Sequence, residues 1–180
     1  MKKYEKTYEE IVPIRFKDAS YENDVPDEVK KIFLEQVRKR EGIYLLGEAG
    51  VGKTHIACAI GKYLLEETQS LLFETSGDLL EKIREDYEAE YNNKEDIFRT
   101  LMNFPGILIL DDIGAEKTSS WVVERLYLIL NKRYQDMLPT IFTSNCSIEE
   151  LSEKFGDRIT SRIVGMAAIV EINGEDKRIK

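Results

Sequence analysis

The sequence predicts an α/β fold in which a five-stranded parallel sheet is flanked by helices. Three observations support this prediction. A glycine-rich loop joins an apolar run to a helix-like segment, four further apolar runs have the length of strands, and two of the runs end in polar residues. Continuous apolar runs are typical of parallel strands that are buried on both faces. The length of 180 residues suits one such domain with its own core.

The first strand is predicted at Ile43–Leu46, and a complete P-loop follows it before a helix at His55–Leu65. The loop has the pattern G-x-x-x-x-G-K-T and consists of Gly47, Glu48, Ala49, Gly50, Val51, Gly52, Lys53 and Thr54. In a P-loop, backbone N–H groups and the helix N-terminus face phosphate oxygens. We expect Lys53 to reach the β- and γ-phosphates and the Thr54 hydroxyl to bind Mg²⁺. The alternative, a turn that binds nothing, does not explain the full motif between a strand and a helix.

The next predicted strand, Ser70–Thr75, lies between the P-loop helix and an aspartate-containing strand, and we expect this extra strand to separate the other two. A helix is indicated by Leu79, Leu80 and Ile83. The stretch from Glu81 to Asp96 is crowded with charge, which is typical of a solvated helical face, although a binding surface is the alternative.

The third apolar run, Gly106–Leu110, ends in Asp111 and Asp112. The carboxyl ends of parallel strands are where α/β sheets place ligand chemistry. We expect Asp111 to hold Mg²⁺ and Asp112 to polarise the water that attacks the γ-phosphate. Aspartate is also common where a strand leaves the sheet. Together with a P-loop, however, the pair indicates phosphoryl transfer, which requires a metal ion and a positioned water.

The remaining elements alternate in the same way. A helix is predicted from Val122 to Tyr134, with Ser119 or Ser120 as its N-cap. The fourth run, Thr140–Thr143, is followed by Ser144 and Asn145. We expect Asn145 to hydrogen-bond the γ-phosphate or the attacking water, and its alternative role is a helix cap or turn. A fifth run, Ala167–Ile172, completes the parallel sheet.

Composition limits the class of protein further. The sequence divides into an irregular leading segment, residues 1–28, interrupted by Pro13 and Pro26, and a core, residues 29–180. It contains no apolar run long enough to span a membrane and no signal peptide, and its two cysteines lack metal-ligand spacing, so a cytoplasmic protein is expected. The net charge of −8 argues against generic attraction to nucleic acid, so any DNA contact must come from local patches.

Four segments together resemble AAA+ ATPases of the initiator and helicase-loader branch: 47–54, 107–112, 142–145 and 156–162. The resemblance is closest to bacterial replicative-helicase loaders of the DnaC/DnaI type, and transposition helper ATPases of the IstB type share most of the motifs. It extends from about Pro13 to Arg178 and implies ATP/ADP and Mg²⁺ as ligands. Asp112 is one methylene shorter than the glutamate common at this position, which implies slow or partner-dependent hydrolysis.

The resemblance also assigns three arginines. Arg162 would be an arginine finger that acts in trans on ATP bound to a neighbouring subunit, with Arg158 assisting; a guanidinium suits the charge that develops in phosphoryl transfer. Taken alone, this pair at i, i+4 spacing would equally fit surface salt bridges. The C-terminal helical lid of a full AAA+ module is expected to be absent, and Arg178 is then the candidate for a lid-type arginine at the γ-phosphate, although a solvated terminus is the alternative.

Single-stranded DNA contacts are implied at two places. Tyr87, with Tyr91, lies in the region where loaders carry an extra helix, and Lys117, Ser119 and Trp121 lie in the loop after Asp-Asp. Aromatic rings offer stacking platforms for bases, and lysine or hydroxyl groups meet phosphates. The alternative for Trp121 is an anchor in the core or in an interface. His55, which directly follows the P-loop, is counted with the nucleotide-binding residues and is expected to give packing or polar support.

Three functions are therefore open. The favoured one is an ATPase that assembles head to tail or helically on ATP, binds single-stranded DNA and helps to load the replicative helicase. The helicase would be a partner if the full-length protein has the N-terminal helicase-binding domain that loaders usually carry. The second is a transposition helper ATPase that binds duplex DNA. The third is a nucleotide-dependent switch in which hydrolysis is incidental. No membrane partner is expected.

Overall fold

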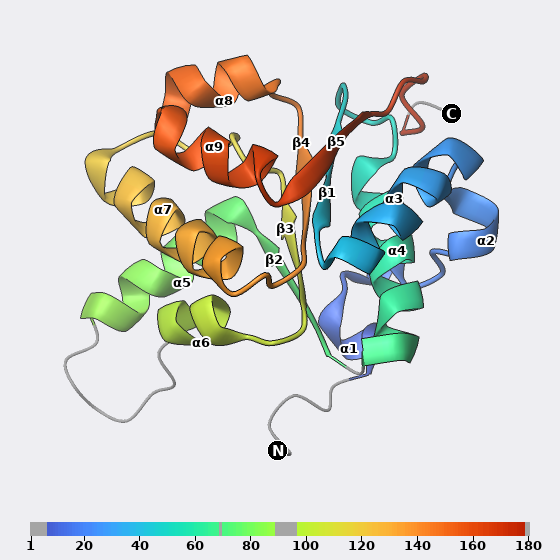
Figure 1. Ribbon diagram of the computed structural model, residues 1–180, viewed down its shortest axis with the longest axis horizontal. Coiled ribbons are helices and arrows are strands. Elements are labelled where there is room, and N and C mark those ends of the chain that lie inside the picture. Colours follow the sequence, from blue (N-terminus) through green and yellow to red (C-terminus); the bar gives the residue numbers. More distant parts are fainter. Residues whose placement is uncertain (1–6, 69, 89–96, 179–180) are drawn as a thin grey trace.

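The computed structural model describes residues 7–68, 70–88 and 97–178, and its centre is a parallel five-stranded sheet (Figure 1). The strands lie close to the predicted runs. Their bounds are Gly42–Leu46 (β1), Leu71–Thr75 (β2), Ile107–Asp111 (β3), Thr140–Ser144 (β4) and Ala167–Glu171 (β5). All four strand pairings are parallel, so the carboxyl ends of the strands lie at one edge of the sheet. The predicted α/β fold is confirmed.

The spatial order of the strands is β2-β3-β4-β1-β5, which corrects one expectation. The P-loop strand β1 and the aspartate strand β3 are separated, but the strand between them is β4 and not the 70–75 run. That run forms β2, the edge strand beyond β3. Burial explains the arrangement: every residue of β4 is buried, whereas only the first residue of β2 is. Strand β4, whose apolar and small polar residues are all buried, lies at the centre of the sheet. Strand β2, which is mostly half-buried, lies at its edge.

Helices cover both faces of the sheet (Figure 1). One face carries α1 (Tyr8–Ile11), η1 (Ile14–Phe16), α2 (Tyr21–Asp24), α3 (Asp27–Lys39) and α4 (Lys53–Thr68). The other carries α5 (Ser76–Glu88), α6 (Ile97–Asn103), α7 (Ser120–Gln135), α8 (Ile148–Phe155) and α9 (Asp157–Val164). Alternating strand residues supply the two cores: Ile43 and Leu45 face α4, and Tyr44 lies between them on the opposite face.

The leading segment is attached to α4. Residues 7–26 form short helical turns, and Tyr8, Val12 and Val25 are buried in the same core as α4. The Tyr8 hydroxyl shares its single donor hydrogen between the backbone oxygens of Phe16 and Cys58, at 3.0 and 3.2 Å. The segment therefore reaches α4 directly behind the P-loop. Among the described residues, no helix is long and apolar enough to cross a bilayer.

A buried arginine joins three elements on the opposite face. Arg133 of α7 is fully buried, and its guanidinium donates to the Thr140 hydroxyl and to four backbone oxygens. The accepting carbonyls belong to Leu101, Phe104, Gly106 and Pro139. Burial lowers the pKa of Arg133 to about 9, so the group remains charged at neutral pH. This network fixes the end of α6 and the starts of β3 and β4.

Candidate nucleotide-binding site

The P-loop runs from the end of β1 into α4, as the sequence predicts. Gly50 and Gly52 have φ angles of +87° and +103°, a region that side chains disfavour. At Gly47 the constraint is space, because a Cβ there would lie 2.3 Å from the backbone oxygen of Ile172. Val51 is buried in the core and anchors the loop from below. The loop backbone is thus held in a shape that only glycines permit.

Lys53, the first residue of α4, points back into the loop. Its Nζ donates to the backbone oxygens of Gly47 and Glu48 and to Asn145 Oδ1, at 2.9, 2.8 and 2.6 Å. The side chain is buried, and this burial lowers the pKa of Lys53, while the charges of Asp112 and Asp111 act in the opposite direction. All three ammonium donors are therefore used by protein acceptors, and a bound phosphate would have to replace some of them.

A single hydroxyl joins the two aspartates. Thr143 Oγ1 of β4 donates to Asp111 Oδ1 at 2.6 Å and accepts from the Asp112 backbone N–H at 2.9 Å. Burial raises the pKa of Asp111, and hydrogen bonds from Thr143 and Thr54 oppose that rise. Asp112 itself is exposed and has a φ of +58°, an uncommon backbone state that aspartate tolerates better than most residues. The strained backbone turns Asp112 away from β3 toward the cavity that it lines.

Asn145 follows β4 and meets the P-loop through Lys53. The turn that presents it is fixed by Ser144, whose hydroxyl donates to the Ile113 backbone oxygen at 2.5 Å and accepts from the Cys146 N–H at 3.0 Å. Helix α8 has its own cap, Ser147, which accepts from the Glu150 N–H. Asn145 is therefore not the helix cap, and it lines the cavity with its amide oxygen bonded to Lys53.

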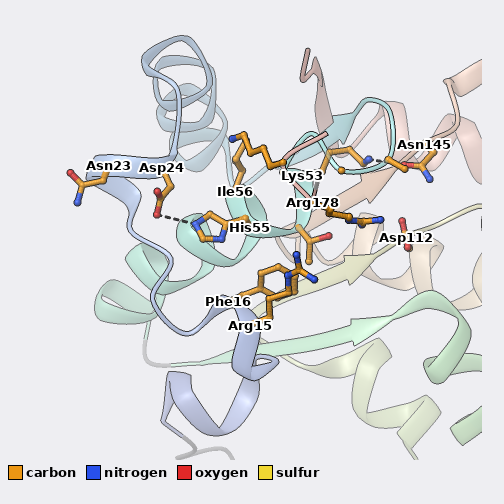
Figure 2. A pocket seen from close by; sticks show the side chains of 15 residues that line it. Arg15, Phe16, Asn23, Asp24, Lys53, His55, Ile56, Asp112, Asn145 and Arg178 are labelled. Atoms are coloured by element: carbon orange, nitrogen blue, oxygen red, sulfur yellow. Dashed lines mark hydrogen bonds and ion pairs between the residues drawn. The ribbon is translucent and has the colours of Figure 1, made fainter. Parts of the chain in front are cut away.

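These side chains surround a cavity of about 470 Å³ (Figure 2). The lining includes Lys53, Thr54, Asp112 and Asn145, and it also includes residues of the leading segment. Those additional residues are Arg15, Phe16, Asn23 and Asp24. Sequence reasoning missed them, and no motif marks them. The only sequence signal was that the resemblance begins near Pro13, ahead of the predicted core.

His55 connects the leading segment to the P-loop helix. Its Nε2 lies 3.0 Å from Asp24 Oδ2, and the Phe16 ring meets its ring edge-on (Figure 2). The hydrogen bond from His55 lowers the pKa of Asp24. His55 thus lines the cavity and contacts the leading segment that forms one wall of it.

Arg178 also lines the cavity, between Lys53 and Asp112 in Figure 2. Its charge contributes to the lowered pKa of Lys53, which places the two cations within electrostatic reach of one another. The sequence left Arg178 open between a γ-phosphate contact and a solvated terminus, and its side chain lies at the cavity.

The donor set near Thr54 fits a magnesium ion. The Thr54 hydroxyl lies close enough to Asp111 to oppose the rise in the pKa of that carboxyl, and the described residues contain no group of three or more histidine, cysteine or acidic side chains arranged for a metal. Mg²⁺ in nucleotide sites uses one or two protein oxygens, with phosphates and waters as its other ligands. A hydroxyl beside one buried carboxylate is such a partial set.

The two α9 arginines do not line this cavity. The Arg158 guanidinium lies 4.1 Å from the centre of the Tyr127 ring, and that of Arg162 lies 5.1 Å from the centre of the Tyr134 ring. Arg162 Nε also donates to Asn131 Oδ1 at 2.8 Å. Both arginines are therefore held against α7, and among the described residues neither forms an ion pair with a carboxylate.

The residues predicted to contact DNA lie apart from the cavity lining. Ser119 caps α7 by accepting from the Val122 N–H, and Lys117 is exposed in the preceding loop. Trp121 is partly buried against the α7 core, with the Arg84 guanidinium 5.0 Å from its ring centre. The side chain of Tyr87 and all of Tyr91 lie outside the described residues. Trp121 therefore packs against the core, which was the alternative to DNA contact, and it remains partly exposed.

Comparison with known proteins relates this site to a family. A sequence model of the family described as "IstB-like ATP binding protein" matches residues 14–180. The replicative helicase loader DnaI of Bacillus subtilis (strain 168) is 31% identical over 153 residues, which cover 78% of this chain and 48% of the loader. A putative ATP-binding protein of insertion sequence IS5376 from Geobacillus stearothermophilus is 30% identical over 150 residues, which cover 80% of this chain and 58% of that protein.

Solved structures agree with the sequence comparisons. The crystal structure of the DnaC helicase loader superposes with a TM-score of 0.79 at 26% identity, and the match covers 89% of this chain and all of that chain. The described fold is thus that of the loader's AAA+ domain. The chain spans about half the length of the curated relatives that it matches.

Proposed function

The chain belongs to the IstB-like ATP-binding protein family, and from this premise we propose that it binds and hydrolyses ATP as a helicase loader in DNA replication. In this proposal it assembles on ATP, binds single-stranded DNA and helps to place the replicative helicase. The observation that supports it most is the convergence of the P-loop, Asp112 and Asn145 on one cavity, with the buried Asp111 joined to Asp112 through Thr143. Phosphoryl transfer needs little more from a protein than charge neutralisation and positioning, and these residues supply both.

Each group has a defined task in the proposed reaction. The Lys53 ammonium leaves some of its carbonyl contacts and neutralises the β- and γ-phosphate oxygens. Asp112, held by Thr143 at its backbone, orients the attacking water and accepts hydrogen bonds from it. Asn145 exchanges its bond to Lys53 for a bond to the γ-phosphate or to that water. Thr54 and Asp111 would hold Mg²⁺, which supplies Lewis-acid charge to the phosphates when bound.

The trans role of Arg162 is part of the same proposal. Its absence from the cavity lining of its own subunit supports a role at a neighbouring site. In the assembly, Asn131 would keep the Nε–H, and the two terminal nitrogens would donate to oxygens of a neighbour's γ-phosphate. Such an arrangement repeats the same contact from one subunit to the next and builds a head-to-tail assembly, which becomes a helix if the ring does not close.

A second function, assistance to a transposase, has a specific observation in its favour. The insertion-sequence relative is nearly as similar to this chain as the helicase loader, at 30% against 31% identity, and the family model carries the IstB description. Both functions use the same nucleotide site, so the partner and the form of DNA must distinguish them.

The test uses the full-length product of the gene with ATP and Mg²⁺, and the Lys53→Ala protein serves as its control. The loader function predicts capture of the host's replicative helicase by the parent, and turnover that responds to single-stranded DNA. Capture of a transposase, with a response to duplex DNA, would favour the second function. Turnover that ignores both forms of DNA, with neither partner captured, would contradict both and favour a nucleotide-dependent switch.

A further inference from the structure

We propose that Lys177 is a second phosphate-binding lysine, which contacts the α- and β-phosphates of the bound nucleotide from the segment that follows β5. The inference rests on the proposed ATP-binding function and adds to it a ligand residue outside the P-loop. Lys177 lies next to Arg178, but the two side chains face different parts of the loop, and we assign them to different phosphates.

The segment that carries Lys177 is tied to the start and to the middle of the P-loop. Directly after β5, the Ile172 N–H donates to the backbone oxygen of Leu46 at 2.6 Å, at the point where the loop begins. Further on, the Lys177 N–H donates to the backbone oxygen of Gly50 at 3.0 Å. Between the two ties, the segment crosses the loop. Lys177 is therefore presented from a backbone position that the loop itself fixes.

A side-chain bond shapes the turn that holds Lys177. Asp176 Oδ1 accepts from the Arg178 N–H at 2.8 Å. The same carboxylate oxygen lies against the backbone of Gly50, only 1.9 Å from the position that a Cβ on this glycine would take. The turn thus fits closely onto the loop at a residue that has no side chain.

The Lys177 ammonium lies over Gly52. Its Nζ is 3.3 Å from the position of a Cβ on Gly52, and Lys177 is part of the cavity lining. In a P-loop, the backbone N–H groups of the glycine-rich turn cradle the α- and β-phosphates. The Lys177 ammonium, which lies over Gly52, therefore faces the α- and β-phosphates of a bound nucleotide.

Lys177 is available for this role, whereas Lys53 is already engaged. The three donors of Lys53 are all taken up by Gly47, Glu48 and Asn145. The Lys177 ammonium has no hydrogen bond or ion pair among the described residues, although its charge is felt by Asp24 across the cavity and helps to lower the pKa of that carboxyl. A lysine is a compact charge with three rotatable donors, which suits phosphate oxygens.

Arg178 acts at the other end of the phosphate chain. Its charge is felt by Lys53, and Figure 2 shows its side chain between Lys53 and Asp112, where the attacking water is expected. The two neighbouring cations therefore make separable predictions. Loss of the Lys177 charge lowers the affinities for ADP and ATP equally, whereas loss of the Arg178 charge lowers the affinity for ATP more than that for ADP.

Isothermal titration with ADP and with a non-hydrolysable ATP analogue tests the assignment. Lys177→Ala and Lys177→Gln leave the backbone bond to Gly50 in place and remove the ammonium; the glutamine variant keeps part of the side-chain stem. We expect each to weaken both nucleotides about tenfold, the effect of one charge-assisted hydrogen bond. Lys177→Arg should bind more tightly than Lys177→Ala. Lys31→Ala, which removes an exposed charge on α3, is the matched control and should bind like the parent.

Several results would overturn the inference while leaving ATP binding intact. One is parental nucleotide affinity in both Lys177→Ala and Lys177→Gln. Another is a loss of affinity for the ATP analogue but not for ADP. A third is a loss of affinity in Lys31→Ala equal to that in the Lys177 variants. Thermal melting of each variant identifies a folding defect, and in that case the remaining neutral variant decides. Parental affinity in Lys53→Ala would contradict something different, the nucleotide site itself.

Discussion

Replacing Thr143 by valine removes the hydroxyl that joins Asp111 to Asp112 and leaves the shape of the side chain almost unchanged. Thr143 is fully buried and Asp111 is nearly so, so the carboxylate cannot regain a water molecule in place of the lost donor. A hydrogen bond to a charged group contributes about 1.5–3 kcal/mol. Asp112 is exposed, so its N–H recovers water and adds little to the loss.

We therefore expect Thr143→Val to lower the free energy of unfolding by about 2 kcal/mol, which corresponds to a fall of about 4–8 °C in Tm for a domain of this size. Hydrolysis should fall further than nucleotide affinity, by about fivefold, because the backbone of Asp112 is no longer held. Thermal melting and single-turnover hydrolysis measure the two effects.

Thr160→Val is the matched control, because Thr160 is also buried but its hydroxyl only donates to the backbone oxygen of Asp157, at 3.3 Å. This control should melt close to the parent and turn over at the parental rate. A Thr143→Val protein with parental Tm and parental turnover would refute the reasoning, as would equal losses in both variants.

The remaining predictions concern other parts of the molecule. Arg133→Met should destabilise the fold by about 3 kcal/mol or more, because buried carbonyls lose their donors, whereas Lys132→Met, which breaks a surface pair, should change little in urea unfolding. Arg162→Ala should bind ATP yet hydrolyse it poorly, and mixing it with Lys53→Ala should restore turnover at composite sites; no rescue at any ratio would count against a trans finger. The pKa of Asp24 is lowered in the folded protein, so its stabilising effect is present above the unfolded carboxyl pKa and is lost as pH falls through the folded value. Asp24→Asn should therefore reduce the fall in the free energy of unfolding as pH decreases through the acid range. An unchanged pH dependence would show that the bond to His55 is not stabilising.

The sequence was sufficient for the elements that local pattern defines. The P-loop glycines, the strand before Asp111 and a serine cap at the start of α7 each depend on neighbours a few residues away. The structure has them where they were predicted, with Ser119 as the cap and not Ser120. The strand order was only partly predictable. An apolar run shows that a strand exists, but burial on both sides decides which strand lies at the centre, and β4 took the place expected for β2.

The missed residues depend on contacts between distant parts of the chain. Phe16 and Asp24 reach the cavity because the leading segment packs on α4, and Lys177 reaches it because the segment after β5 returns to the loop. The position of Arg133 in a helix gives no indication that it is buried. Its acceptors are backbone oxygens at the end of α6 and just before β3 and β4. Sequence periodicity does not predict these contacts, because they form between distant segments only when the chain has folded.

The most direct test of the account is the affinity of the site for ATP. Isothermal titration of the parent with ATP and Mg²⁺ should show binding at one site per chain, and Lys53→Ala should abolish or severely weaken it, since backbone N–H groups alone do not neutralise the phosphates. Asp112→Asn should bind like the parent and hydrolyse poorly. Parental ATP affinity in Lys53→Ala would contradict the account, because the cavity around Lys53 would then not be the nucleotide site.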